Sequence, residues 1–257
     1  MYTPDAAPVI AQVAPQPGSP GALDFDGVHD FVEISHDSSL DPKRQLTLET
    51  WFRVDEFKNI FMPIVTKGSG TSAATRSYSL WIGYAGPGKG FLYFTTADGS
   101  YEDGIITPFG SIEAGKWYHF AGVMNRDTGR LEAYLNGELV GSGTVRSSNT
   151  ATHTKPLLIG QTYESAWYIS PFCGAIDEVR LWNVARGAQE IRSDMSKTLE
   201  GNEGGLVGLW RFNEVSGTVV EDSSTKDNDG RFGSITPQIT GSSLALDGSG
   251  DYLMTPN

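Results

Sequence analysis

Alternation of apolar and polar residues is most regular in the segment LTLETWFRV, residues 46–54. Every second side chain of a β-strand points to the same face, so one face is predicted to carry Leu46, Leu48, Thr50, Phe52 and Val54. The opposite face is predicted to carry Thr47, Glu49, Trp51 and Arg53. The pattern predicts a half-buried strand whose second face is polar.

Two parts of the chain have the features of β-hairpins. Residues 78–84 (YSLWIGY) and 90–96 (GFLYFTT) are joined by AGPGK, whose glycines and proline favour a tight loop. Residues 129–143 contain Asn136-Gly137, a pair favoured in type I′ turns because both residues tolerate positive φ. Apolar segments that predict further strands lie at residues 116–125, 155–161, 173–183, 206–213 and 217–223.

A single segment predicts a helix. In residues 184–199 (VARGAQEIRSDMSKTL), Ile191 and Met195 are four residues apart, and Leu199 follows one turn later. About ten short strands with tight turns and one late helix predict an all-β chain, folded as a two-sheet antiparallel β-sandwich with one short helix near its C-terminal end. A parallel βαβ fold requires repeated helices between strands, and the sequence lacks them.

Composition narrows the possible partners. The chain has 31 acidic and 19 basic residues, a formal net charge of −12. Nucleic acid is not expected as a partner, because neutralising phosphates requires clustered Lys and Arg. The single cysteine, Cys173, excludes a disulfide within the chain and a cysteine-based zinc site. No apolar run approaches the roughly 18 residues of a membrane span, so membrane insertion is not expected.

The two ends of the chain differ from its middle. Residues 1–20 are rich in proline and alanine and predict an extended linker, and the sandwich is predicted over residues 21–232. Residues 233–257 contain LALDGSGDYLMT (244–255), which repeats the pattern of LDFDGVHDFVEI (23–34). This tail resembles the start of a further repeat in a tandem array, or else forms an added strand that pairs with its own or a neighbouring molecule.

The order of the segments resembles a known family. ALDFDGVHDFVEI, LTLETWFRV, IVTKG, SYSLWIG, KWYHFAGVMNRDTGRLEAYLNGELV, LLIGQ and GAIDEVRLWN follow one another as in the laminin-G-like, or concanavalin A-like, jelly-roll family. The chain is most similar to bacterial laminin-G-like modules and their pentraxin relatives. The resemblance implies a secreted or cell-surface recognition module that binds glycans or proteins, often holds Ca²⁺, and is attached to neighbouring domains of the same polypeptide.

Catalytic patterns are absent from the sequence. Glycan-hydrolysing relatives of this fold place glutamates and an aspartate in an E-x-D-x-E pattern, and no Glu of this chain is followed by x-D. In Asp177-Glu178 the adjacent side chains would point to opposite faces of a strand. No G-x-S-x-G segment accompanies the four histidines, and His119 is expected to pack inside a strand. The chain is therefore predicted to be non-catalytic, with a glycan-active enzyme as the weakest alternative.

Calcium is the predicted metal. Hard cations prefer carboxylate and carbonyl oxygens, and neither DFDG nor DNDG continues as an EF-hand loop. The resemblance implies that Asp26, the carbonyl of Gly27 and Asp177 converge on a structural Ca²⁺, with Asp30 as a further ligand. Asp177 alternates with Val179 and Leu181, and an acid on an apolar face needs a partner. The alternatives are Arg180 as that partner, or a β-bulge that turns Asp177 outward.

A second calcium position follows only from the pentraxin resemblance. It implies metal ligands at Gln161 and Glu164, just after LLIGQ. The neighbouring Thr162 and Tyr163 and the acid-free segment KGSGTSAATRS argue against a pentraxin-type double site.

Two aromatic groups are candidates for ligand binding. The segment GQTYESAWYISPFCG contains Tyr163, Trp167 and Tyr168, whose exposed rings would stack on sugars or on a protein. The alternative is that these rings fold over the edge of the sandwich. Trp51 and Arg53 form a second candidate platform, unless a loop covers their face. The predicted ligand is a glycan or a cell-surface protein, and an adhesin, scaffold or spacer role is the alternative to carbohydrate binding.

Overall fold

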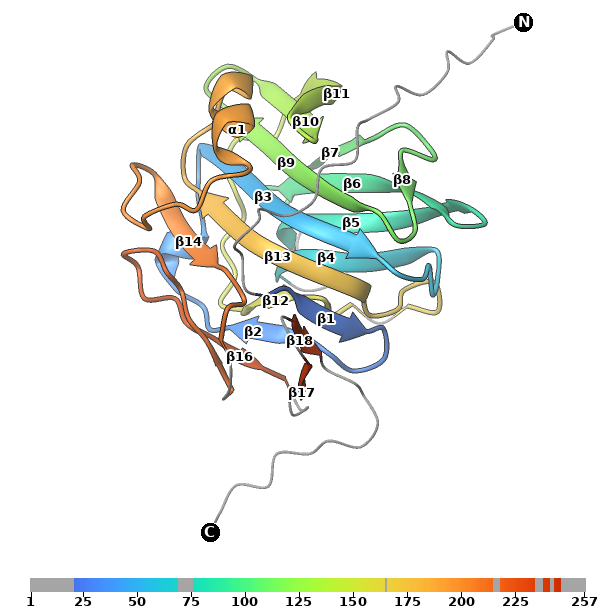
Figure 1. Ribbon diagram of the computed structural model, residues 1–257. Helices are drawn as coiled ribbons and strands as arrows, with labels where there is room; N and C mark the ends of the chain where they lie inside the picture. The colour runs from blue at the N-terminus through green and yellow to red at the C-terminus, as the bar shows by residue number, and fades with distance from the viewer. Residues whose placement is uncertain are drawn as a thin grey trace, which may run out of the picture.

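The computed structural model describes residues 21–68, 76–164, 166–214, 218–233, 238–240 and 243–245, and its strands form two sheets packed face to face (Figure 1). In spatial order, sheet A contains β11 (Glu138–Thr144), β10 (Arg130–Leu135), β9 (Trp117–Asn125), β3 (Gln45–Val54), β13 (Cys173–Trp182), β1 (Leu23–Asp26), β18 (Ser243–Ala245) and β17 (Gln238–Thr240), with β14 (Leu206–Trp210) paired to β13.

Sheet B contains β15 (Val219–Val220), β16 (Gly230–Phe232), β2 (Val32–Ile34), β12 (Leu157–Ile159), β4 (Phe61–Gly68), β5 (Arg76–Gly86), β6 (Lys89–Ala97) and β7 (Glu102–Ile106), with β8 (Ile112–Glu113) paired to β6. A short 3-10 helix, η1, spans Ser38–Leu40. All strand pairs of both sheets are antiparallel except β1 with β18. The predicted two-sheet antiparallel sandwich is confirmed.

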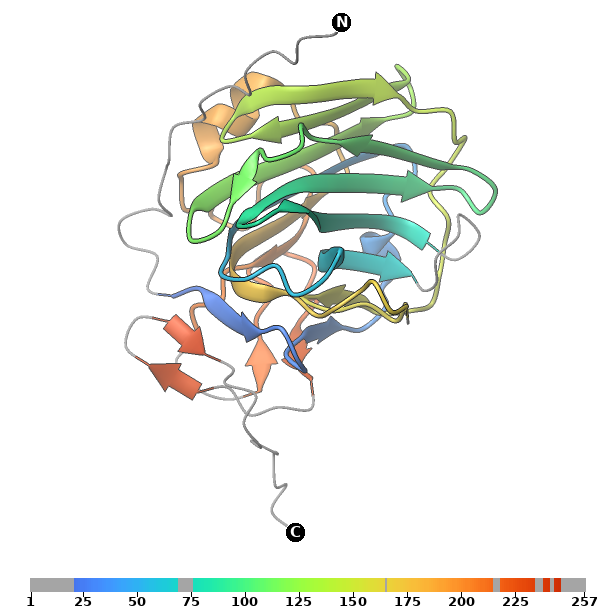
Figure 2. The same ribbon diagram turned by 90° about the vertical axis from the view of Figure 1, so that its right-hand side faces the viewer.

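The hydrophobic core fills the space between the two sheets, whose strands Figure 2 shows after a 90° turn from Figure 1. Alternate residues of each strand point into it, including Leu48 and Phe52 of β3, Leu80 and Ile82 of β5, Leu92 and Phe94 of β6, and Phe120 of β9. Such burial contributes roughly 25 cal/mol per Å² of apolar surface. The sequence alternation therefore identified the inner faces of the longest strands.

Both predicted hairpins are present. Gly86 pairs with Lys89 at the end of the β5–β6 ladder, which places the turn within the predicted loop. Between β10 and β11, Asn136 has φ 50° and Gly137 has φ 79°, the two positive values of a type I′ turn.

The predicted half-buried strand is instead buried on both faces. Thr47, Glu49 and Trp51 of β3 are between 0% and 2% exposed, although they point away from the core between the sheets. The chain after β13 covers them: Thr47 Oγ1 donates to Val184 O at 2.8 Å, and Trp51 Nε1 donates to Met195 O at 2.7 Å. The expectation of a solvent-facing polar side was wrong because this later segment folds back over sheet A.

The covering segment includes α1, which spans only Ala188–Asp194 of the predicted 184–199. It begins late because Gly187 is extended, with φ −83° and ψ 159°. Ile191 packs against Ala121, Val123 and Tyr134 of sheet A. Among the described residues, no helix has the length and apolar character needed to cross a membrane.

A buried polar cluster lies under this segment. Arg186 Nη1 donates to Glu49 Oε1 at 2.8 Å, Arg186 also pairs with Asp194, and His119 Nε2 lies 3.4 Å from Glu49 Oε2. Burial lowers the pKa of His119, and the nearby positive charges of Arg180 and Arg186 add to this effect against the opposing influence of Glu49. His119 is 1% exposed, as expected for a packed strand residue.

Part of the tail lies beside the first strand. β17 and β18 form a hairpin, and β18 runs parallel to β1, with Leu23 opposite Leu244 and Asp24 opposite Ala245. This placement corresponds to the added-strand alternative within one molecule. The domain boundaries stay predictions, and the linker 1–20 and residues 246–257 lie outside the described residues.

The environment of His119 predicts a pH dependence of stability. The unfolded chain binds a proton near the ordinary histidine pKa of about 6.5, whereas the folded chain resists protonation of His119. The stabilising contribution is therefore fully present above that pH and is lost as the pH falls. We expect the free energy of unfolding to decrease from pH 7.5 to 5.5, with a slope from this one proton of at most about 1.4 kcal/mol per pH unit.

Urea denaturation across this range, on the wild type and on His119→Gln, checks the prediction. The variant is expected to show a shallower slope. Equal slopes in both proteins would contradict the assignment to His119.

Candidate functional site

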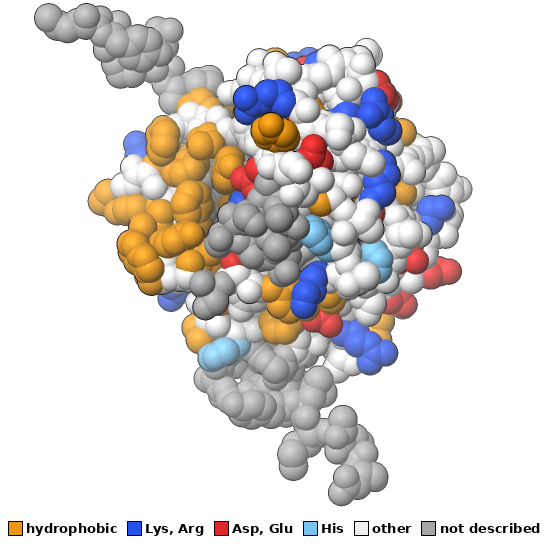
Figure 3. All heavy atoms as spheres, turned by 180° about the vertical axis from the view of Figure 1, so that it is seen from behind, with side chains coloured by type: hydrophobic (Ala, Val, Ile, Leu, Met, Phe, Trp, Pro, Cys, Tyr) orange, Lys and Arg blue, Asp and Glu red, His pale blue; other side chains and the backbone are white. Residues whose placement is uncertain are grey.

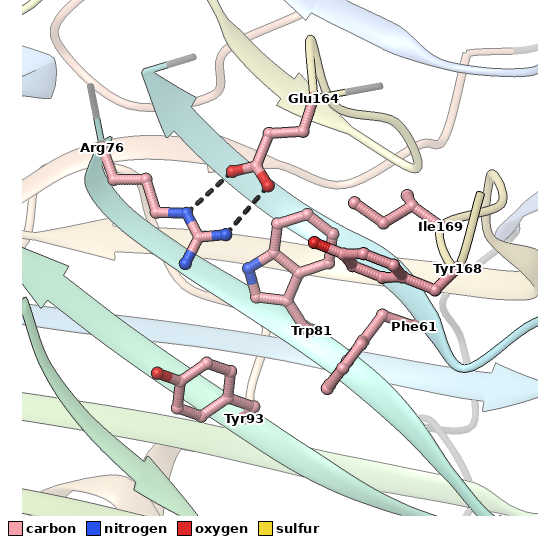
Figure 4. Close-up of a pocket in the computed structure, with 7 residues that line it drawn as sticks. All are labelled: Phe61, Arg76, Trp81, Tyr93, Glu164, Tyr168 and Ile169. Carbon is pink, nitrogen blue, oxygen red and sulfur yellow. Dashed lines mark hydrogen bonds and ion pairs between the residues drawn. The ribbon is translucent and has the colours of Figure 1, made fainter. Parts of the chain in front are cut away.

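A pocket of about 130 Å³ opens on the outer face of sheet B. We call it the Trp81 pocket; its lining residues are Phe61, Arg76, Trp81, Tyr93, Glu164, Tyr168 and Ile169 (Figure 4). Strands β4, β5 and β6 supply the first four, and the segment between β12 and β13 supplies the others. Its volume is below the roughly 300 Å³ at the lower end of sites for drug-sized ligands, so any larger ligand would extend beyond it.

Strand register explains why aromatic rings meet here. Leu80 and Ile82 point into the core, so Trp81 between them points outward. Trp81 pairs across the strands with Tyr93 of β6 and Pro63 of β4. Its indole Nε1 donates to Ser79 Oγ at 2.6 Å, which fixes the ring orientation. The floor of the pocket is therefore an indole of fixed orientation that is only 3% exposed.

The loop that closes the pocket is attached to the start of β4. Phe61 N donates to Tyr168 O at 3.0 Å, and Ser170 N donates to Phe61 O at 3.1 Å. Phe61 and Ile169 also form a parallel β-bridge. These backbone bonds hold the Tyr168 side chain beside Trp81, as Figure 4 shows.

Two glycines leave room for rings on this face. A Cβ at Gly83 would lie 2.2 Å from Phe91 Cζ, and a Cβ at Gly104 would lie 2.6 Å from Tyr93 Cε2. Neither position accepts a side chain unless the ring moves. Phe91 and Tyr93 can therefore lie flat across the neighbouring strands.

Five rings form a continuous series that we call the aromatic row: Phe109, Phe91, Phe61, Tyr168 and Trp167. Successive centroid distances are 4.5, 6.0, 6.5 and 5.6 Å. The two end residues are the most exposed, Phe109 at 69% and Trp167 at 83%. Hydrophobic side chains gather on one side of the face seen in Figure 3, which views the molecule from behind Figure 1.

An ion-pair network forms the polar wall of the pocket. Arg76 donates from Nε and Nη2 to the two oxygens of Glu164 at 2.7 and 2.8 Å, and from Nη1 to Glu102 Oε2 at 2.9 Å. Tyr93 OH donates to Glu102 Oε1 at 2.9 Å. The guanidinium carbon lies 5.4 Å from the centroid of the Trp81 ring. All four carboxylate oxygens thus accept hydrogen bonds from the protein.

The network has one positive and two negative charges. Burial disfavours the charged form of Arg76, but the hydrogen bonds and charges of Glu164 and Glu102 outweigh burial and raise the pKa of Arg76. Burial and the charge of Glu102 also raise the pKa of Tyr93, so its phenol stays protonated. The three-residue network therefore has a formal excess of one negative charge, whereas its two members that line the pocket, Arg76 and Glu164, balance each other.

The three aromatic loop residues predicted to bind ligand lie in different surroundings in the structure. Tyr168 lines the pocket, and Trp167 ends the aromatic row. Tyr163 turns toward β2, where its OH donates to Glu33 Oε2 at 2.8 Å, and burial with this bond raises the pKa of Tyr163 to about 12. Phe172, from the same segment, is fully buried in the core.

The second predicted platform, Trp51 with Arg53, lies on the other sheet. Trp51 is 2% exposed beneath the segment that follows β13, so the alternative, that later chain covers this face, is the one observed. Arg53 is partly exposed, but its guanidinium pairs with Asp55 at 2.6 Å and lies 5.4 Å from the ring centroid of Trp117. These two residues do not form one surface.

The predicted calcium ligands Asp26 and Asp177 do not converge. Asp26 pairs with Cys173, four residues before Asp177 on β13, which is about 13 Å at the rise of a β-strand. Asp26 Oδ1 instead accepts from Val28 N and His29 N at 2.7 and 3.1 Å, within the turn that contains Gly27. The expected pairing of the two aspartates was therefore wrong.

Asp30 belongs to the same turn, because its Oδ2 accepts from Asp26 N at 2.9 Å. Its side chain thus has a structural partner within the turn.

A β-bulge explains the position of Asp177. The register between β13 and β3 shifts between Asp177 and Arg180, and Glu178 has φ 49°. The extra residue moves Asp177 to the face of Trp51, away from Val179 in the core. The bulge alternative was thus correct, and the expected alternation was wrong.

The described residues contain no group of three or more His, Cys, Asp or Glu side chains placed to hold a metal ion. Glu164, which the pentraxin resemblance implies as a metal ligand, uses both oxygens for Arg76.

Sequence reasoning missed most of the pocket. Trp81 and Tyr93 could have been found, because the predicted hairpin already pairs them across its loop. Arg76 and Glu102 carry no local signal, since only the folded sheet brings them to Glu164.

Comparison with known proteins identifies similar sequences. A family model described as the concanavalin A-like lectin/glucanases superfamily matches residues 26–192. A rat protein, "Sushi, von Willebrand factor type A, EGF and pentraxin domain-containing protein 1", is 26% identical over 215 residues, 79% of this chain. The chain spans only 6% of the length of that relative.

Solved structures share the fold at low identity. A proposed carbohydrate-binding protein from Bacteroides ovatus superposes with a TM-score of 0.65 at 23% identity, over 82% of this chain and 57% of that one. The sialidase module CBM40 of Ruminococcus gnavus, bound to α2,3-sialyllactose, gives a TM-score of 0.55 at 14% identity, over 69% of this chain and 97% of that one.

Proposed function

Because this chain belongs to the concanavalin A-like lectin/glucanases superfamily, we propose that it is a carbohydrate-binding module whose ligand occupies the Trp81 pocket. The proposal rests on one observation: aromatic rings and a hydrogen-bonded ion pair line the same pocket. Sugar rings have apolar C–H faces that pack on aromatic rings, and hydroxyl groups that donate and accept hydrogen bonds. The partly exposed rings of Phe61 and Tyr168 supply the first type of contact above the buried Trp81, and the partly accessible guanidinium of Arg76 supplies the second.

The same network supports binding without catalysis. Glycoside hydrolysis requires one carboxylic acid that gives a proton and a second carboxylate that acts as base or nucleophile. In the pocket, both oxygens of Glu164 accept from Arg76, and those of Glu102 accept from Arg76 and Tyr93. Neither carboxylate is placed to transfer a proton or to attack a sugar.

The proposal includes an extracellular or cell-surface location within a larger polypeptide. Its support is the rat relative, which has a pentraxin domain among several other domain types and of which this chain matches a small part. The alternative, an adhesin or scaffold module that docks proteins, uses the same exposed rings and is separated from carbohydrate binding by the experiment below.

Replacement of Tyr168 tests the pocket. Tyr168→Ala removes one aromatic wall but leaves the core unchanged, and we expect glycan binding to weaken at least about tenfold, equivalent to about 1.4 kcal/mol. A glycan array identifies the ligand, and calorimetric titration measures the dissociation constants of wild type and variant.

The control is Trp117→Ala, which removes an aromatic ring beside Arg53 on sheet A. It is expected to bind like the wild type. Binding of no glycan by the wild type, with capture of a defined cell-surface protein, would support the docking alternative.

A structural Ca²⁺ stays a prediction from the family resemblance, but sugar binding in the pocket is expected to be independent of it. The carboxylates of Glu102 and Glu164 already bind Arg76, so they need no cation. Titrations in EDTA and in excess CaCl₂ should give equal affinities. A loss of binding in EDTA that Ca²⁺ restores would contradict this expectation.

A further inference from the structure

We propose that the ligand surface continues from the Trp81 pocket along the aromatic row to Phe109, and that it takes an extended, uncharged glycan chain. This inference rests on the proposed carbohydrate binding and specifies its ligand class. Two observations carry it: the continuity of the rings beyond the pocket, and the pairing of the Arg76 guanidinium with two carboxylates, Glu164 in the pocket lining and Glu102 beside it.

The row extends well past the pocket. Phe61 is shared, since it lines the pocket and contacts Phe91 at a centroid distance of 6.0 Å. Phe91 is 6% exposed and supports Phe109, whose ring lies 4.5 Å away and is 69% exposed. On the other side, Trp167 follows Tyr168 at 5.6 Å. A ligand limited to one sugar would leave both exposed ends of the row without contact.

The shape of the row suits a chain of linked rings. Because the pocket volume is about 130 Å³, additional sugar units must lie outside it, on the surface that the row provides. Each sugar face that packs on a ring buries apolar C–H surface, so the affinity should increase with each unit until the row is covered.

The charges of the Arg76 network favour an uncharged chain. An acidic sugar needs a positive partner for its carboxylate, and the guanidinium lining the pocket, Arg76, already binds Glu164 in a bidentate pair and Glu102 through Nη1. Because Glu102 lies next to the lining and is paired with Arg76, the network keeps a formal excess of one negative charge, which would repel a ligand carboxylate. Neutral hydroxyl groups meet no such repulsion.

The first test is a chain-length series. Gluco-, galacto- and xylo-oligosaccharides, from mono- to hexasaccharide, are titrated against wild type and Phe109→Ala. For the wild type, we expect the affinity for one series to rise at least tenfold with length and then to level off. Phe109→Ala is expected to lose most of this gain and to bind the shortest ligand as the wild type does. Because Phe109 is 69% exposed, its truncation leaves the core packing intact, and circular dichroism checks the fold of the variant.

A second variant disturbs the aromatic row by moving a ring and removes none. In Gly83→Ala, the added Cβ meets the Phe91 ring and displaces the support of Phe109, so the length-dependent gain should also decrease. Gly143→Ala is the matched control, because a Cβ at this position of β11 meets no atom within 4 Å. It should keep the full gain.

The third test concerns charge. Lactose is compared with sialyllactose, and we expect the neutral sugar to bind at least tenfold more tightly, by a factor that decreases as salt screens the repulsion. Tighter binding of the sialylated sugar would overturn the inference on charge. Equal affinity for all chain lengths, or an unchanged gain in Phe109→Ala, would overturn the inference on the extended surface.

These outcomes separate the two proposals. If binding requires Tyr168 but not chain length or Phe109, the pocket stands and the extension fails. If no sugar binds and Phe109→Ala abolishes self-association in sedimentation, the row serves a second copy of the chain, and both proposals fail.

Discussion

Each sheet buries one face of its strands against the other sheet, so every residue between two core positions must point away from the core. The molecule meets this constraint in two different ways. Sheet A is covered by α1 and its flanking segment, which bury Glu49 and Trp51 in a hydrogen-bonded cluster. On sheet B, the outward residues near the β5–β6 hairpin are aromatic and partly accessible. The sandwich therefore has one closed outer face and one that can receive a ligand.

The Arg76 network joins parts of the chain that are distant in sequence. Arg76 begins β5, Glu102 begins β7, and Glu164 belongs to the segment after β12. Its bonds hold that segment over Trp81 and also set the electrostatic sign of the pocket. Loss of one carboxylate would thus change both the shape of the pocket and its charge, because a buried guanidinium without full pairing is costly. The position of that segment and the charge beside the pocket therefore depend on the same three side chains.

The sequence was sufficient for the fold because alternation and turn residues are local signals. The β5–β6 hairpin already implied that Trp81 and Tyr93 are neighbours. Local patterns do not show which strand faces are covered by a segment far along the chain. The polarity of Glu49 suggested exposure, but the distant Arg186 pairs with Glu49 inside the protein. The bulge at Asp177 shows a second limit, since one additional residue exchanges the faces of a strand and nothing in the local pattern marks it.

Gly83 and Gly104 give the open face a property that no side chain provides. Each occupies a site where the volume of a missing Cβ is filled by a ring from the adjacent strand. The side chains at 83 and 91 therefore compete for the same volume, as do those at 104 and 93. A larger side chain at one position of a pair requires a smaller one at the other. A larger residue at 83 or 104 is therefore expected to be tolerated only with a smaller residue at 91 or 93, so the two positions of each pair behave as one steric unit.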